Sequence, residues 1–150
     1  MTSQSTNFET AANREPSSSD TAFAPRPLIG GLLFLATAPA HLFLDREASI
    51  TLAAITLALI GGAYIGFGAA DGRAKTFWTE FGVALLFGGA AAAGLLWHWA
   101  ALPIGLALHA GWDLLHRNPG MLARIPRWYI PLCLVFDLLA AAFLTALYAF

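Results

Sequence analysis

Five long apolar segments, separated by short polar breaks, are the feature that most limits how this chain can fold. A helix that crosses a bilayer needs roughly 20 mostly apolar residues. Only 11% of the residues are charged, against about 25% in soluble domains. The sequence therefore predicts an all-α, five-span transmembrane helix bundle. We expect the spans at residues 28–44, 48–70, 77–97, 100–116 and 130–150.

A polar segment precedes the first apolar run. Residues 1–27 are rich in Ser, Thr, Asn, Glu and Pro, a composition that cannot bury enough apolar surface to become ordered. We expect a disordered tail over 1–27 and one integral membrane domain over 28–150. Alternatively, the apolar run 28–35 and the small-residue stretch Ala-Thr-Ala-Pro-Ala at 36–40 resemble a cleavable signal peptide. Cleavage would leave four spans in the same orientation.

The basic residues predict the orientation of the bundle. Lys and Arg concentrate in the cytoplasmic segments of membrane proteins. With five spans and a cytoplasmic amino terminus, only Arg46 falls in an outer segment. We therefore expect the carboxyl terminus outside. The remaining basic residues all fall in inner segments: Arg14, Arg26, Arg73, Lys75, Arg117, Arg124 and Arg127.

Ionisable side chains gather in the cytoplasmic half of the expected bundle. His109, Asp113 and His116 are spaced i, i+4, i+7, which is one face of a helix. Glu80 and Asp137 lie at a similar depth on the third and fifth spans, and the short turn before the fourth span should bring Glu80 near Asp113 and His116. Burying a carboxylate in a bilayer costs about 2.5–3.5 kcal/mol, and residues that bear this cost usually mark function. These five residues therefore form our candidate site.

Two other sets of residues receive weaker interpretations. His41 and His98 fall at the outer membrane boundary, where polar groups are well tolerated, and we assign them no role in the site. Gly62 and Gly66 form a small-xxx-small pair that predicts a close helix contact. The single Cys133 excludes an internal disulfide framework. The chain also lacks a run of basic residues that would favour binding to a nucleic acid.

Several separated elements resemble a group of small bacterial integral membrane proteins that have no established activity. Their hallmark is a His-Ala-Gly-Trp-Asp-x-x-His-His helix followed by a Cys-x-x-x-Asp helix. Arg117 departs from this pattern, which tends to have a second His there. The resemblance implies a helical protein of the bacterial cytoplasmic membrane and no particular reaction. In this chain the matching elements are Ala63–Gly66, Glu80, His109–His116, Pro126 and Cys133–Asp137.

The candidate site favours a membrane-embedded metal-dependent enzyme, a hydrolase or an oxygenase. Imidazole and carboxylate are ligands for zinc and iron, so His109, Asp113, His116 and Asp137 could hold the metal. Glu80 and Asp113 are the candidate catalytic residues, with Glu80 as general base. A substrate that reaches this site from the bilayer would be a lipid, fatty acyl or isoprenoid molecule.

Two alternatives use the same residues differently. In a proton- or cation-coupled transporter they would relay protons or bind a cation, although the chain shows no inverted repeat. In a structural or accessory subunit of a membrane complex, His–Asp hydrogen bonds would lock the helices together. Besides the bilayer, the expected partners are a lipophilic small molecule and further copies of this chain.

Overall fold

The computed structural model describes residues 26–118, 120 and 122–150, and the described residues form five helices without a strand. The helices match the expected spans to within three residues at either end. Residues 1–25 of the expected tail lie outside the described residues, while Arg26 and Pro27 belong to the first helix. The bounds are α1 Arg26–Phe43, α2 Arg46–Asp71, α3 Ala74–Leu96, α4 Ala101–Leu115 and α5 Tyr129–Ala149.

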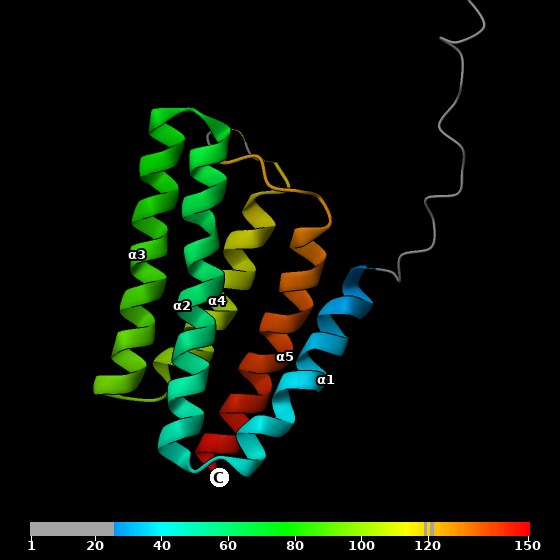
Figure 1. Ribbon diagram of the computed structural model, residues 1–150, viewed down its shortest axis with the longest axis vertical. Helices are drawn as coiled ribbons and strands as arrows, with labels where there is room; N and C mark the ends of the chain where they lie inside the picture. Colours follow the sequence, from blue (N-terminus) through cyan, green and yellow to red (C-terminus); the bar gives the residue numbers. More distant parts are fainter. Residues whose placement is uncertain (1–25, 119, 121) are drawn as a thin grey trace, which may run out of the picture.

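The helices run up and down in an antiparallel bundle (Figure 1). The main helix pairs are α2 with α3, α4 with α5, and α1 with α5, while α4 also contacts α2 and α3. One end of the bundle, here called the basic end, holds the α2–α3 turn and the segment between α4 and α5. The opposite end holds the α1–α2 and α3–α4 turns and the carboxyl terminus.

Local sequence signals set the bounds of the helices. Asp45 caps α2, since its backbone is extended and its side chain accepts a hydrogen bond from the Ala48 amide at 2.8 Å. Gly72 ends α2 with a left-handed φ of 77°, a conformation that glycine adopts without strain. Pro131 lies in the first turn of α5, where the missing amide removes no helical hydrogen bond.

Four helices, α1, α2, α3 and α5, are long and apolar enough to cross a membrane. The fourth expected span is the exception, because α4 has 15 residues. At about 1.5 Å per residue it is about 22 Å long, shorter than the roughly 30 Å hydrocarbon core. The apolar helices indicate an integral membrane protein, as the sequence predicted.

Large apolar side chains cover the outside of the bundle. Soluble monomers rarely expose apolar patches of more than a few hundred Å², whereas a lipid-facing surface is apolar throughout. Every helix contributes such side chains, so the exposed surface is suited to a bilayer. Examples with at least half of the side chain exposed are Leu35, Leu59, Leu86, Leu108 and Leu138.

The helix contacts use different glycines from those that the sequence predicted. Gly62 and Gly66 face open space, where an added Cβ would meet nothing within 4 Å. At Gly61, an added Cβ would lie 2.5 Å from the Phe87 Cβ on α3. The small-xxx-small spacing was thus a wrong guide to the contact face of α2.

Candidate metal centre

The polar residues of α4 all point into the bundle. His109 and Asp113 are fully buried and His116 is nearly so, which confirms that the i, i+4, i+7 spacing marks the inner face of the helix. Gly105, one turn before His109, allows this burial. An added Cβ there would lie 2.5 Å from Leu57 Cδ2 on α2, so the missing side chain lets α2 and α4 approach closely.

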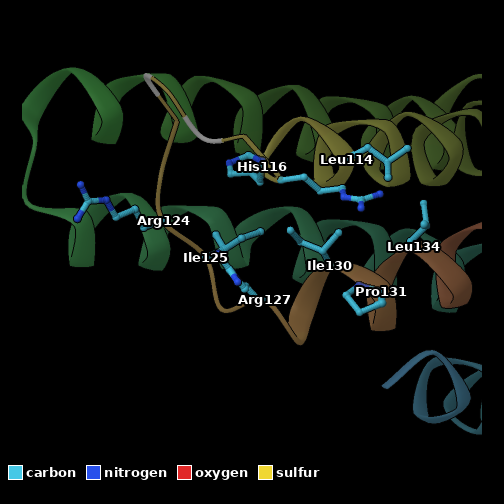
Figure 2. A pocket seen from close by; sticks show the side chains of 9 residues that line it. Leu114, His116, Arg124, Ile125, Arg127, Ile130, Pro131 and Leu134 are labelled. Atoms are coloured by element: carbon cyan, nitrogen blue, oxygen red, sulfur yellow. The ribbon is translucent and has the colours of Figure 1, made fainter. Parts of the chain in front are cut away.

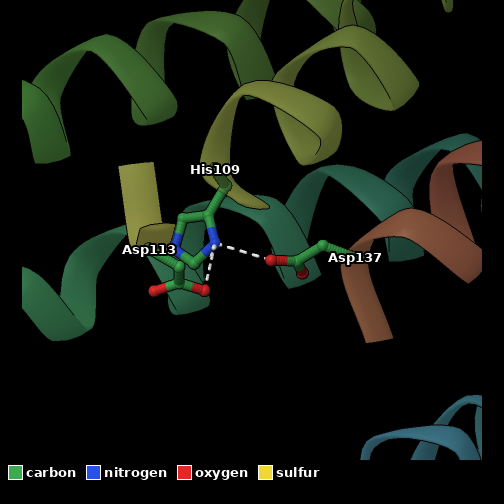
Figure 3. Close-up of side chains that lie close together, drawn as sticks. All are labelled: His109, Asp113 and Asp137. Carbon is green, nitrogen blue, oxygen red and sulfur yellow. Dashed lines mark hydrogen bonds and ion pairs between the residues drawn. The ribbon is translucent and has the colours of Figure 1, made fainter. Parts of the chain in front are cut away.

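His109, Asp113 and Asp137 form a compact group across α4 and α5. His109 Nδ1 lies 2.7 Å from Asp137 Oδ2 and 3.8 Å from Asp113 Oδ2, so one ring nitrogen faces both carboxylates (Figure 3). One ligand atom from each residue lies within 4.8 Å of the other two. A metal ion could therefore bind all three.

Each member of this group also has a buried polar atom without a partner. His109 Nε2, Asp113 Oδ2 and Asp137 Oδ1 make no hydrogen bond within the described part of the chain. The Ile60 carbonyl lies near the His109 ring but makes no hydrogen bond to Nε2. An unsatisfied buried polar group costs about 1–3 kcal/mol, so three of them together indicate a bound ion or water.

The donor set fits a divalent metal after a small adjustment. Zinc lies about 2.0–2.2 Å from imidazole nitrogen and carboxylate oxygen, which places neighbouring ligand atoms of a tetrahedral site about 3.4 Å apart. The 2.7 Å contact between His109 Nδ1 and Asp137 Oδ2 would have to open by about 0.7 Å.

Tyr64 of α2 joins this group, although the sequence analysis did not include it in the site. Its hydroxyl donates a hydrogen bond to Asp113 Oδ1, and its side chain is fully buried. Its ring lies 5.4 Å from the His109 ring and 5.0 Å from the His116 ring, measured between centroids. Tyr64 falls within the Ala63–Gly66 element of the sequence resemblance, which was the one signal for it.

Glu80 and His116 form a second polar set beside the first. His116 Nε2 lies 3.0 Å from Glu80 Oε1, which also accepts a hydrogen bond from the Ala123 amide at 2.8 Å. Trp112 Nε1 donates to Glu80 Oε2 at 3.3 Å. Both oxygens of the Glu80 carboxylate are thus engaged. The expected approach of Glu80 to His116 is confirmed, and Tyr64 lies between the two sets.

His116 is not a member of the three-residue group. Its Nδ1 lies 2.9 Å from the Trp112 carbonyl, and its Nε2 contacts Glu80, so neither ring nitrogen is available as a ligand. Seven residues of helix separate His109 and His116 by about 10.5 Å along the axis. His116 also lies outside the set of residues whose ligand atoms converge within 4.8 Å, although it shares a helix face with His109.

The Glu80–His116 contact holds one transferable proton. The Trp112 carbonyl can only accept, so His116 Nδ1 carries a proton. Nε2 then faces a carboxylate oxygen, and a hydrogen bond between them needs a further proton on the ring or on Glu80. The pair is therefore a buried proton donor next to Tyr64.

The segment after α4 is tied to the basic end by Asp71 and Arg73. Arg73 forms an ion pair with Asp71 and donates a hydrogen bond to the Leu122 carbonyl at 2.9 Å. The Asp71 carboxylate raises the pKa of the Arg73 guanidinium above its usual value. Asp71 also accepts a hydrogen bond from the Arg124 amide at 3.3 Å. These contacts hold the Ala123 amide where it can reach Glu80.

A family model for DUF6010, a family of unknown function, matches residues 26–149. The chain belongs to this family. The match covers all five helices and every residue of the candidate site. No curated protein and no solved structure matches the chain significantly.

Proposed function

We propose that this protein is a membrane-embedded, metal-dependent hydrolase that acts on a lipophilic substrate. His109, Asp113 and Asp137 would hold one divalent ion, with zinc favoured over iron. The observation that carries the proposal is that these three buried residues bring ligand atoms within 4.8 Å of one another, while each also has a buried polar atom without a partner. Three protein ligands leave one coordination position free, which is typical of catalytic rather than structural zinc.

The donor set favours a hydrolase over an oxygenase. Non-haem iron oxygenases typically use two His and one carboxylate, whereas this group has one His and two carboxylates. The second imidazole, His116, is engaged by Glu80 and the Trp112 carbonyl. The hydrolase is therefore the better of the two reactions that the sequence analysis left open.

The bound metal would supply a hydroxide nucleophile near neutral pH by lowering the pKa of a coordinated water. The chain's own residues have separate tasks. His109, Asp113 and Asp137 would hold the ion, and Tyr64 fixes the Asp113 carboxylate through its hydroxyl hydrogen bond. His116 lines the pocket at the basic end, where it could donate the proton that it shares with Glu80 to a leaving group.

This assignment changes two roles that the sequence favoured. His116 becomes a proton donor rather than a metal ligand. Glu80 becomes its positioning partner rather than a general base at the metal, because all the hydrogen bonds of Glu80 connect it to His116, Trp112 and Ala123. Asp113 keeps the role of ligand.

A structural role is the second candidate, and the Glu80–His116 set favours it. Both carboxylate oxygens and both imidazole nitrogens in that set have partners, as expected of a network that only locks α3 to α4 and to the following segment. The unpartnered polar atoms of His109, Asp113 and Asp137 argue against a purely structural role for that group.

Metal analysis tests the proposal. Protein purified in mild detergent without added chelator should contain about one equivalent of zinc or iron, and Asp137→Asn should contain far less. His98→Ala is the control, because His98 is exposed at the opposite end. Unaltered metal content in Asp137→Asn, or no metal in the wild-type protein after supplementation, would reject the metal centre.

A further inference from the structure

A cavity of about 710 Å³ opens at the basic end of the bundle (Figure 2). It lies between the end of α4, the segment that follows it and the first turns of α5. Its lining combines three arginines, one buried imidazole and several apolar side chains. The lining residues are Leu114, His116, Arg117, Arg124, Ile125, Arg127, Ile130, Pro131 and Leu134.

The three arginines, Arg117, Arg124 and Arg127, have no carboxylate partner within the described part of the chain. The two carboxylates nearest the basic end are already engaged. Asp71 is paired with Arg73, and Glu80 with His116. None of the three guanidinium groups forms an ion pair within the described part of the chain, and Arg124 lies within electrostatic reach of the Asp71 carboxylate.

The other side of the cavity is apolar. Ile130, Pro131 and Leu134 belong to the first turns of α5, and Leu114 belongs to the end of α4. Ile130 is buried, while Pro131 and Leu134 are half-buried. The cavity therefore combines arginine side chains with an apolar side formed by α4 and α5.

We propose that this cavity binds an anionic amphiphile, with a phosphate or diphosphate head on the arginines and a hydrocarbon chain along α5. Guanidinium groups bind phosphate oxygens in pairs of parallel hydrogen bonds. Three of them match the charge of a diphosphate or a phosphomonoester better than the single charge of a fatty acid. Of the lipid, fatty acyl and isoprenoid substrates that the sequence left open, the cavity therefore favours those with a phosphate or diphosphate head group.

The cavity lining does not include His109, Asp113 or Asp137, and two rings, those of His116 and Tyr64, lie between the cavity and this group. His116 lines the cavity, its ring lies 5.0 Å from that of Tyr64, and Tyr64 donates to Asp113. A head group on the arginines would therefore lie next to the proton shared by His116 and Glu80. The binding of the amphiphile does not depend on the proposed function. Only the role of the amphiphile as the substrate rests on it.

Binding can be measured on the purified full-length protein in a neutral detergent by isothermal titration calorimetry. The probes are farnesyl diphosphate, dodecyl phosphate, inorganic pyrophosphate and farnesol. We expect farnesyl diphosphate and dodecyl phosphate to bind at least tenfold more tightly than pyrophosphate or farnesol, because only they engage both parts of the cavity. Equal affinity for pyrophosphate and farnesyl diphosphate would overturn the amphiphile proposal.

Matched variants assign the binding to this cavity. Arg117→Gln and Arg127→Gln should each weaken farnesyl diphosphate binding about tenfold, the usual effect of losing one charged hydrogen bond. Arg46→Gln makes the same charge change at the opposite end and should have no effect. Leu134→Ser should weaken farnesyl diphosphate but leave pyrophosphate unchanged. Equal losses in Arg46→Gln and Arg127→Gln would show general charge attraction and reject the site.

Two further measurements distinguish binding at a specific site from contact with bulk membrane lipid and from binding to the metal group. In nanodiscs, an excess of phosphatidylglycerol should fail to displace farnesyl diphosphate, and full displacement would identify the arginines as contacts for ordinary membrane lipid. Asp137→Asn, which disrupts the metal group, should still bind farnesyl diphosphate with wild-type affinity. Loss of binding in this variant, with its fold retained, would reject a separate head-group site. A wild type that binds the probe but takes up no metal after supplementation would reject only the hydrolase.

Discussion

His109 Nδ1 and Asp137 Oδ2 lie 2.7 Å apart at the centre of the bundle, both on fully buried side chains. This contact joins α4, a helix too short to cross a membrane alone, to the long apolar helix α5. His109 also faces Asp113, one turn away on its own helix. The pair is therefore both a direct polar link between the two helices and the core of the proposed metal centre.

We predict that His109→Ala and Asp137→Ala each abolish metal binding and lower stability. Removing one partner of a buried pair leaves an uncompensated polar or charged group, at a cost of about 3–5 kcal/mol. The measurements are metal content per protein and the midpoint of thermal unfolding in detergent. A stability loss with unchanged metal content would instead support the structural reading.

Tyr64→Phe should weaken metal binding without abolishing it. The change removes the hydrogen bond to Asp113 and leaves the ring packing against His109 and His116 intact. Loss of such a supporting contact typically reduces metal affinity 10- to 100-fold. Competition with a chelator of known affinity measures the change. Tyr148→Phe is the matched control, because Tyr148 is a buried tyrosine at the opposite end that also makes a hydrogen bond through its hydroxyl.

Most of the fold could be predicted from the apolar runs alone. The bounds of α4, Ala101–Leu115, differ by one residue at each end from the expected span. What the pattern could not show is which faces meet, because small residues occur on several faces of α2. Gly62 and Gly66 have the contact spacing but face open space, while Gly61 packs against Phe87.

The sequence predicted which residues belong to the candidate site, but not which of them contact one another across helices. Helix spacing brought His109, Asp113 and His116 to one face, and the short turn before α4 correctly predicted the contact between Glu80 and His116. Spacing along one helix does not show which residue of another helix lies opposite each side chain. The division into two hydrogen-bonded sets, with Tyr64 between them, depends on those contacts across helices.

The opposite end holds a hydrogen-bonded chain that the sequence did not indicate. His41 Nδ1 lies 2.8 Å from Ser49 Oγ, which lies 2.7 Å from the Tyr148 hydroxyl. The chain joins α1, α2 and α5, so His41, which the sequence placed at the outer membrane boundary, also links helices there.

Ser49→Ala should lower stability and leave the metal centre untouched. It interrupts the chain between His41 and Tyr148, and losing such hydrogen bonds costs about 0.5–1.5 kcal/mol each. The readouts are the thermal midpoint in detergent and the metal content. Thr51→Ala is a suitable control, since Thr51 is exposed on the same helix and its hydroxyl bonds only to the Glu47 carbonyl of its own helix. A drop in metal content in Ser49→Ala would show that the two ends are coupled.

The orientation of the bundle is the last prediction. Arg73, Lys75 and the arginines between α4 and α5 lie at the basic end, and Arg46 lies at the opposite end. Because basic segments remain on the cytoplasmic side, we expect a reporter fused within residues 117–127 to be cytoplasmic and one fused after Phe150 to be outside. The short helix α4 makes this test informative, since it has to bring the chain back to the cytoplasmic side. If both reporters were found on one side, the helices would not cross the membrane in the order that we expect, and the metal centre would lie at a different depth. Reporter pairs with opposite compartment requirements, an alkaline phosphatase and a fluorescent protein, give each position two independent readings.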